Sequence, residues 1–240
     1  MIPNEKIILA LDVESGGEAL EWVDRLKPFI EWFKIGSQLF LAEGPRIVDQ
    51  VLRNGSKVFL DLKFYDIPHT VAKAGIEATR MGAGMFNVHA LGGAEMMKTC
   101  IESSRNFAIQ NNLPLPKILA VTLLTSHSKI MVETEMGLQG PLVYHSIRLA
   151  KLAKESGIEG VVTSALELPL LRKEFGKDFS YVVPGIRPAW AAHDDQKRVV
   201  TPEEALAHGA SFLVIGRPVL TAEDPEKALQ RIIQEISPTE

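Results

Sequence analysis

Short runs of β-branched and other apolar residues alternate along this chain with longer amphipathic stretches. This alternation predicts β-strands that are each followed by a helix. Eight runs have the length and composition of strands, at residues 7–13, 32–35, 58–62, 85–89, 118–123, 160–163, 181–183 and 212–215. Helical patterns lie between them at residues 17–26, 45–53, 71–81, 94–110, 142–155 and 166–175. Several of these patterns end at a glycine, as helices commonly do.

Strand–helix alternation repeated eight times in 240 residues favours an α/β fold with a single (β/α)8 TIM barrel. No linker or low-complexity stretch interrupts the pattern, so we expect residues 1–240 to form one domain. An open, doubly wound sheet is the alternative. The chain has no Gly-x-Gly-x-x-Gly motif after its first strand, which makes that alternative less favoured.

Composition and charge narrow the class of protein. The chain is 46% hydrophobic and 23% charged, as is ordinary for a soluble globular protein. Its net charge of -4, without a block of basic residues, argues against a nucleic-acid surface. The single cysteine, Cys100, excludes an intrachain disulfide and suits a reducing compartment. No run approaches about 18 apolar residues and no signal segment is present, so we expect a cytoplasmic protein without membrane contact.

Asp61 and Lys63 interrupt the third apolar run, which otherwise resembles a buried strand. Side chains two residues apart on a strand point to the same face, so we expect the two charges to lie together. Burying an ion is costly unless it is paired, and the pair therefore predicts a functional site. The alternative is an ion-paired strand end that simply leaves the core.

Other charged residues also lie where predicted strands end. Asp12 ends the first strand, Lys34 lies in the second, and Arg187 follows the seventh. In a barrel the carboxyl ends of all strands meet at one rim, where catalytic groups are found. These residues therefore predict a site at that rim, although a solvated rim also collects charge.

Two segments near the C-terminus suggest a phosphate ligand. The last strand runs into Gly216-Arg217-Pro218 at the start of a helix, which predicts a phosphate site, with a tight turn and a solvent-facing arginine as the alternative. Residues 184–201 are too long for an ordinary connection. We expect a mobile lid that carries Arg187 and Gln196 and closes on the phosphate, with a disordered insertion as the alternative.

The segment from Asp61 to Thr70 resembles the signature of the orotidine 5′-monophosphate decarboxylase family. Asp-x-Lys-x-x-Asp alone is moderately specific, but further motifs match in order over nearly the whole chain. They are Leu11-Asp12, Phe33-Lys34-Ile35-Gly36, Leu124-Thr125-Ser126, Gly160-Val161-Val162, Pro184-Gly185-Ile186-Arg187-Pro188, Asp195-Gln196-x-Arg198-Val199 and Ile215-Gly216-Arg217-Pro218.

The resemblance implies an enzyme that decarboxylates orotidine 5′-monophosphate to UMP and carbon dioxide, the last step of UMP synthesis, without a cofactor or a metal. Lys63 would be the general acid that protonates C6 of the pyrimidine. Asp61 would lie beside the substrate carboxylate, and Lys34 and Asp66 would complete an alternating Lys-Asp-Lys-Asp array. Flanking carboxylates favour the ammonium form of a lysine, which suits Lys63 to this role.

The resemblance also implies the binding residues and a partner. Asp12 and Lys34 would hold the ribose hydroxyls, and Ser126 the pyrimidine edge. The remaining substrate contacts would come from Asp61, Thr70, Thr125, Pro184, Arg187, Gln196, Gly216 and Arg217. The active enzyme would be a homodimer in which Asp66 and Thr70 reach into the site of the partner.

Two positions depart from the usual family pattern, because Tyr65 stands where histidine is common and His69 where asparagine is common. We expect His89, which ends the fourth strand, to bind no metal.

Three alternatives remain open: a related metal-dependent sugar-phosphate decarboxylase or aldolase barrel, a non-catalytic nucleotide-binding barrel, and a structural barrel whose rim charges are merely solvated.

Overall fold

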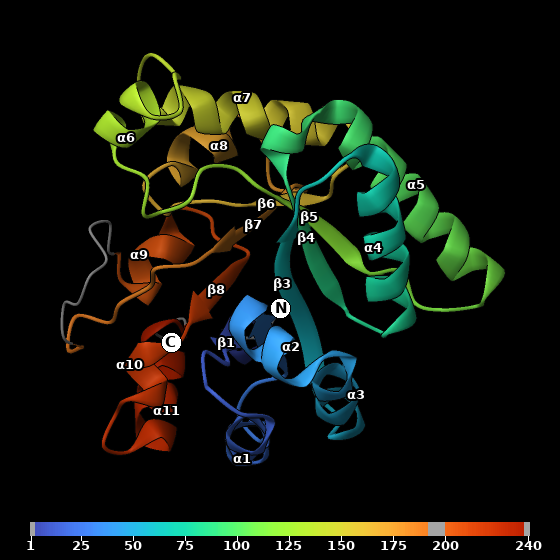
Figure 1. Ribbon diagram of the computed structural model, residues 1–240. Helices are drawn as coiled ribbons and strands as arrows, with labels where there is room; N and C mark the ends of the chain where they lie inside the picture. The colour runs from blue at the N-terminus through green and yellow to red at the C-terminus, as the bar shows by residue number, and fades with distance from the viewer. Residues whose placement is uncertain (1–2, 192–199, 238–240) are drawn as a thin grey trace.

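Eight parallel strands close into a barrel in the computed structural model of the chain, which describes residues 3–191 and 200–237 (Figure 1). Each strand pairs with the next along the chain, and the last pairs with the first. The strands are β1 (Ile7–Ala10), β2 (Trp32–Gly36), β3 (Lys57–Phe64), β4 (Met85–His89), β5 (Lys117–Val121), β6 (Gly160–Val162), β7 (Ser180–Val183) and β8 (Phe212–Ile215). The predicted (β/α)8 fold is confirmed.

The helices lie around the outside of the barrel (Figure 1). They are α1 (Gly16–Leu26), α2 (Ser37–Glu43), α3 (Pro45–Arg53), α4 (Pro68–Arg80), α5 (Gly93–Gln110), α6 (Lys129–Thr134), α7 (Leu142–Glu155), α8 (Leu168–Phe175), α9 (Pro202–Ala207), α10 (Arg217–Leu220) and α11 (Pro225–Glu235), with 3-10 helices η1 (Pro3–Lys6) and η2 (Ala90–Gly92). No helix within the described ranges is both long enough and apolar enough to cross a lipid bilayer.

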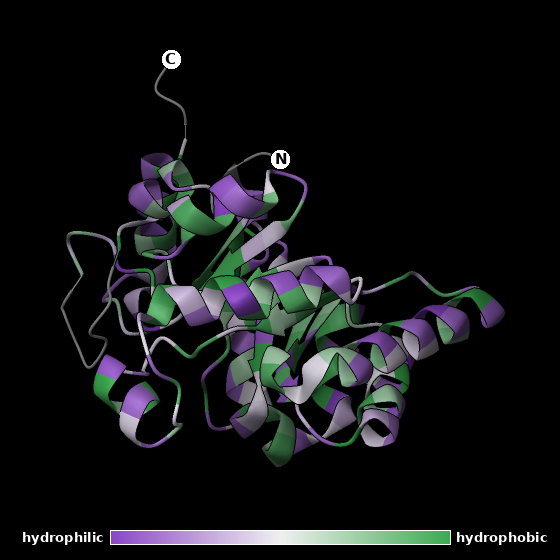
Figure 2. Cartoon of the chain, turned by 90° about the horizontal axis from the view of Figure 1, so that it is seen from above, coloured by the Kyte–Doolittle hydropathy of each residue, from purple (hydrophilic) through white to green (hydrophobic). Residues whose placement is uncertain are grey.

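The strands are apolar on both faces because both faces are buried. Outward-facing residues such as Ile7 and Leu9 pack against the helices in the larger apolar cluster. Inward-facing residues fill the barrel from every strand, and Figure 2 shows the hydrophobic strands at the centre of the molecule. This inner cluster contains Ile8, Ala10, Phe59, Met85, Leu119, Val121, Val162, Val182, Phe212 and Val214, with Trp32 and Leu124 packed against it.

Strand β3 departs from regular pairing just where its charges begin. Its register against β4 shifts, because Leu60 pairs with Phe86 whereas the next pair is Phe64 with Val88. Asp61, Leu62 and Lys63 therefore lie opposite one β4 residue, Asn87. Lys63 has a φ of 50°, in the left-handed region that residues with a Cβ rarely occupy. The charges of Asp61 and Lys63 do lie together. Asp61 follows the alternation expected from sequence, whereas a bulge brings Lys63 to it.

Candidate active site

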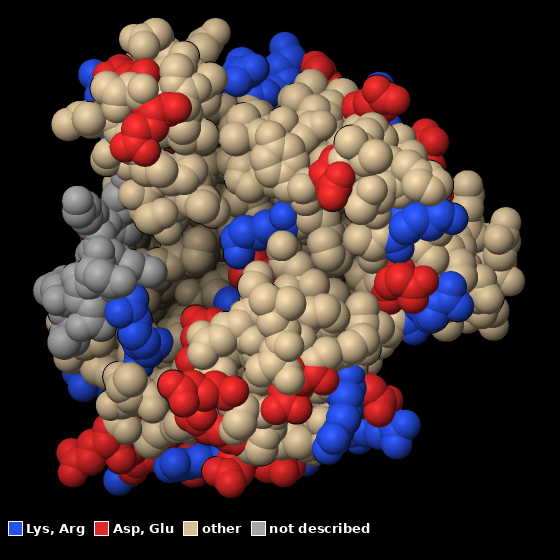
Figure 3. Space-filling view, viewed as in Figure 1, with Lys and Arg blue, Asp and Glu red and all other residues tan. Residues whose placement is uncertain are grey.

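A cavity of about 290 Å³ opens at the carboxyl ends of the strands. In Figure 3 acidic and basic side chains meet in a hollow of the molecule. Ten of the residues predicted from sequence line this cavity, namely Asp12, Lys34, Asp61, Lys63, Thr125, Ser126, Pro184, Arg187, Gly216 and Arg217. Residues that are up to 205 positions apart in the sequence are thus brought to one site, since Asp12 and Arg217 both line it.

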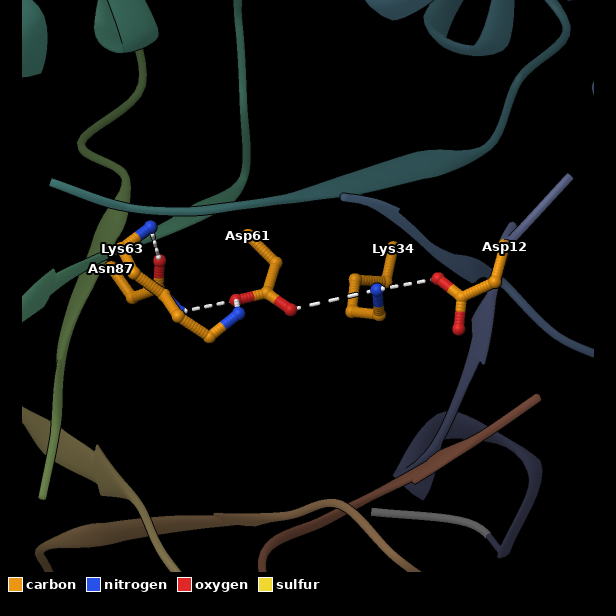
Figure 4. A network of polar contacts seen from close by, with 5 residues as sticks. All are labelled: Asp12, Lys34, Asp61, Lys63 and Asn87. Carbon is orange, nitrogen blue, oxygen red and sulfur yellow. Dashed lines mark hydrogen bonds and ion pairs between the residues drawn. The ribbon is translucent and has the colours of Figure 1, made fainter. Parts of the chain in front are cut away.

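Four charged side chains form a continuous row across the cavity (Figure 4). The Lys34 ammonium lies 3.0 Å from a carboxylate oxygen of Asp12 and 3.5 Å from Oδ2 of Asp61. The other oxygen of Asp61, Oδ1, lies 2.8 Å from the Lys63 ammonium. Positive and negative groups therefore alternate from Asp12 to Lys63.

The inner members of this row are the most buried. The side chains of Lys34 and Asp61 are 10% and 13% exposed, whereas those of Lys63 and Asp12 are 37% and 62% exposed. A buried ion is tolerated when an opposite charge compensates for its lost hydration. Lys34 and Asp61 supply this compensation to each other, and the more exposed Lys63 ammonium can still face a ligand in the cavity.

The strand pattern explains how these charges reach the interior. Lys34 lies two residues beyond Trp32, and Asp61 lies two residues beyond Phe59, so each continues an inward-facing row. The charged side chains thus form a polar layer directly above the apolar filling of the barrel. Every second residue of a strand faces inward, and Lys34 and Asp61 occupy the next inward position after Trp32 and Phe59.

Asn87 belongs to the same layer and was not predicted from the sequence. It lies two residues beyond the inward-facing Met85 and is fully buried. Its side chain contacts both Asp61 and Lys63 (Figure 4). A signal was present, because asparagine is unfavourable within an apolar strand, just as the charges of β3 are.

The described residues predicted for the phosphate follow β7 and β8 and line the same cavity. Gly216 follows β8, and Arg217 begins the four-residue helix α10. Arg187 is only 6% exposed, and its backbone N–H donates to the Val200 carbonyl at 3.1 Å, beside the bridge between Ile186 and Val200. The prediction placed Arg187 on a mobile lid, but the structure places it at the anchored base of that loop. Gln196 lies outside the described residues.

Asp66 and Thr70 do not reach this cavity. Both residues are exposed, and neither lines it. A carboxylate oxygen of Asp66 accepts a 2.6 Å hydrogen bond from the Ile67 N–H, just before α4. Within one chain, the alternating row therefore runs Asp12-Lys34-Asp61-Lys63 and does not include Asp66.

The residues that depart from the family pattern follow β3 and do not line the cavity. The Tyr65 ring stacks on His89, with ring centroids 5.6 Å apart and planes 24° apart, while His69 is exposed on α4. Nδ1 of His89 accepts a 3.3 Å hydrogen bond from the Leu91 N–H at the start of η2. Within residues 3–191 and 200–237, no three or more His, Cys, Asp or Glu side chains are grouped so that they could hold a metal ion.

Burial lowers the pKa of His89 below its ordinary value, and the charges of His127 and Lys63 act in the same direction. The folded state therefore favours the neutral ring, and this contribution to stability is lost as the pH falls below about 6.5, the unfolded value. We expect the free energy of unfolding to fall less between pH 7 and pH 5 in His89→Asn than in the unaltered protein. Denaturant titrations at both pH values measure this, and an identical pH dependence would contradict the assignment.

The barrel and its cavity define a class of protein: a (β/α)8 enzyme-like barrel with a polar site at the carboxyl rim, where lysines alternate with aspartates. The model of the orotidine 5′-phosphate decarboxylase / HUMPS family matches residues 5–232. The chain belongs to this family.

Individual relatives agree with the family match. The chain is 50% identical over 235 residues to an orotidine 5′-phosphate decarboxylase of Syntrophotalea carbinolica, covering 98% of this chain and 96% of the relative. It is 48% identical over 232 residues to that of Geotalea daltonii, covering 96% and 95%. Among solved structures, orotidine 5′-phosphate decarboxylase from Lactobacillus acidophilus superposes with a TM-score of 0.84 at 35% identity, over 97% of this chain and 99% of the other.

Proposed function

We propose that the protein decarboxylates orotidine 5′-monophosphate to UMP and carbon dioxide. The observation that carries this proposal is the row of alternating charges, which ends at the Lys63 ammonium on the wall of the cavity. Such a row supports a reaction that builds negative charge at one carbon and then protonates it. The family of the chain, and the names of its relatives, identify the compound that carries this carbon.

In the proposed reaction, the bond between C6 of the pyrimidine and its carboxylate carbon breaks, and the electron pair remains on C6. This carbanion lies in an sp² orbital with little resonance from the ring, so stabilisation has to come from fixed charges around it. The Lys63 ammonium supplies a positive charge and then transfers its proton to C6, which yields UMP. Neutral Lys63 regains a proton from water.

Asp61 has two roles in this proposal. It holds the Lys63 ammonium through Oδ1, and through Oδ2 it interacts with Lys34. We place it next to the carboxylate of the substrate, so that departure of carbon dioxide relieves a contact between like charges. Lys34 and Asp12 lie on the far side of this pair, and we assign them to the ribose hydroxyls.

The part of the cavity wall that follows β7 and β8 suits the 5′-phosphate. Arg187 and Arg217 bring two guanidinium groups to it, and Gly216 leaves the backbone open to an anion at the end of β8. The loop after β5 supplies Ser126 for the pyrimidine edge and Thr125 for further contacts around the nucleotide, and Pro184 lies at the end of β7. Base, ribose and phosphate would thus each meet a different part of the wall.

Arg217→Ala tests the phosphate assignment. We expect it to weaken binding of UMP by about 100-fold and binding of uridine by less than about threefold, because one charge-assisted contact contributes about 1.5–3 kcal/mol. Isothermal titration with both ligands measures the difference. Arg46→Ala, which alters an exposed arginine on α3 that does not line the cavity, is the matched control. Equal losses for UMP and uridine would reject the assignment.

We also propose a homodimer in which Asp66 and Thr70 complete the partner's site. Support comes from their position, because both are exposed, lie just past the catalytic strand and miss their own cavity. The neighbouring apolar side chains of Tyr65 and Ile67 are 61% and 65% exposed, as suits a surface that a second copy covers.

The decisive test follows the ultraviolet absorbance of orotidine 5′-monophosphate with purified protein from which metals have been stripped. We expect its conversion to UMP, with the same rate in the presence of a chelator. Activity that disappears in chelator and returns with a divalent cation would favour the metal-dependent sugar-phosphate barrel. Tight UMP binding without conversion would favour a nucleotide-binding protein.

A further inference from the structure

Asn87 lies where the pairing between β3 and β4 is interrupted, and its side chain makes a hydrogen bond in place of the missing backbone pair. The bulge in β3 leaves Asp61, Leu62 and Lys63 opposite Asn87 alone, between the pairs Leu60 with Phe86 and Phe64 with Val88. The Asn87 side chain is fully buried and does not line the cavity. A polar group in such a position needs partners, because an unpaired buried amide is costly.

Both ends of the Asn87 amide are used. Its Oδ1 accepts a 2.8 Å hydrogen bond from the backbone N–H of Lys63, and its Nδ2 donates a 2.7 Å hydrogen bond to Oδ1 of Asp61. The chemistry of the partners fixes this orientation, because a backbone N–H only donates and a carboxylate only accepts. The Asp61 oxygen that Asn87 contacts is the one that also holds the Lys63 ammonium.

The bond to the backbone acts at a strained residue. Lys63 and Asn112 are the only non-glycine residues of positive φ within the described ranges, with values of 50° and 51°. A lysine adopts this conformation only where its surroundings hold it. If the Asn87 amide were lost, nothing in the ladder between β3 and β4 would replace the bond to the Lys63 N–H, since that stretch is unpaired.

We propose that Asn87 is a positioning residue for the decarboxylation, acting through Asp61 and Lys63 without touching the substrate. It holds the Lys63 backbone in the left-handed conformation and fixes the Asp61 carboxylate, so that the ammonium is aimed into the cavity. This inference rests on the proposed function. It assigns the amide a role in turnover and none in nucleotide affinity.

Asn87→Asp separates positioning from packing, because it exchanges one NH2 group for an oxygen. The new carboxyl can still accept from the Lys63 N–H, but when ionised it repels Asp61. Lys63 on β3 and Lys34 on β2 contact Asp61, and His89 lies two residues further along β4. Burial and the neighbouring Asp61 favour the protonated form of the new group, whose O–H can then donate as the amide does.

We expect Asn87→Asp to lower kcat about 100-fold at pH 8, as small misplacements of reacting groups do, with KM and the UMP dissociation constant changed less than threefold. The ratio of the Asn87→Asp kcat to the kcat of the unaltered enzyme should rise at least tenfold as the pH is lowered from 8 to 5.5. Asn87→Ser, which is too short to bridge both partners, should show the same loss without this recovery. Asn112→Asp, the same exchange at the exposed left-handed residue, is the control and should keep full activity.

Thermal unfolding and UMP titration show how much of each variant is folded, and kcat is expressed per UMP-binding site. If Asn87→Asp folds poorly, the kcat of Asn87→Ser per UMP-binding site decides whether Asn87 has the positioning role. If the unaltered protein is active and the Asn87 variants keep an unimpaired kcat, the positioning role is overturned and the proposed function is not. A loss of kcat that follows a loss of UMP affinity, with no recovery at low pH, would also overturn it. Unaltered protein that leaves orotidine 5′-monophosphate intact would instead refute the proposed function, and the positioning role with it.

Discussion

Lys63→Ala is expected to lower kcat by about 10⁴-fold or more. A general acid contributes about 10²–10⁴-fold, and Lys63 would also supply the positive charge nearest to the developing carbanion. A 10⁴-fold loss corresponds to about 5.5 kcal/mol of transition-state stabilisation. The measurement is the decay of orotidine 5′-monophosphate absorbance under saturating substrate.

Two further variants make this result specific. Lys173→Ala removes an exposed lysine on α8 and should leave kcat unchanged. Lys63→Arg keeps a positive charge but offers a guanidinium that does not release its proton near neutral pH, so we expect it to remain strongly impaired. Turnover by Lys63→Ala at the rate of the Lys173→Ala control would refute Lys63 as the proton donor.

Mixing two inactive variants is expected to restore activity if the sites are shared between subunits. In a mixed dimer of Asp66→Ala and Lys63→Ala, one site carries both changes and the other carries neither. Random exchange makes half of the dimers mixed, so about a quarter of the unaltered number of sites should be active. Activity is followed while subunits exchange, and exchange itself is monitored with differently tagged chains.

The matched control mixes Asp61→Ala with Lys63→Ala. These two side chains contact each other within one chain, so every site of a mixed dimer carries one of the changes. No activity should return in this mixture. If exchange is complete and the Asp66→Ala mixture also stays inactive, Asp66 does not act across the interface.

Much of the fold follows from sequence, because barrel strands are apolar on both faces and stand out from amphipathic helices. All eight strands were predicted, with ends that differ by up to three residues; the first, for example, ends at Ala10 and not at Val13. The missed helices include α6 and α9, of six residues each, which are too short to show a helical period. Helix α11 was also missed, although Asp224 and Pro225 form a recognisable start.

The site was less completely predictable. Charges in an apolar strand identified Asp61 and Lys63, but the bulge that places Lys63 depends on pairing with β4, which one strand's sequence does not reveal. Asn87 was missed because an uncharged amide draws less attention than an ion, although burying it unpaired is also costly. Arg187 was assigned to a lid from loop length alone, whereas the pairing of Ile186 with Val200 anchors it at the base.

The pairing of β1 with β8 has a consequence for how the site comes into existence. The charged row comes from the first three strands, and the residues proposed for the phosphate follow the last two, so these two parts of the cavity become neighbours only when the ends of the sheet join. A chain that lacks β8 and the residues after it would keep the charged row but lose Gly216 and Arg217, two of the residues proposed for the phosphate. A nucleotide that bridges both parts would stabilise the joined sheet selectively, by about 2.7 kcal/mol at 100 times its dissociation constant. Such a ligand would hold the two ends of the sheet together, and its binding would show that β8 has paired with β1.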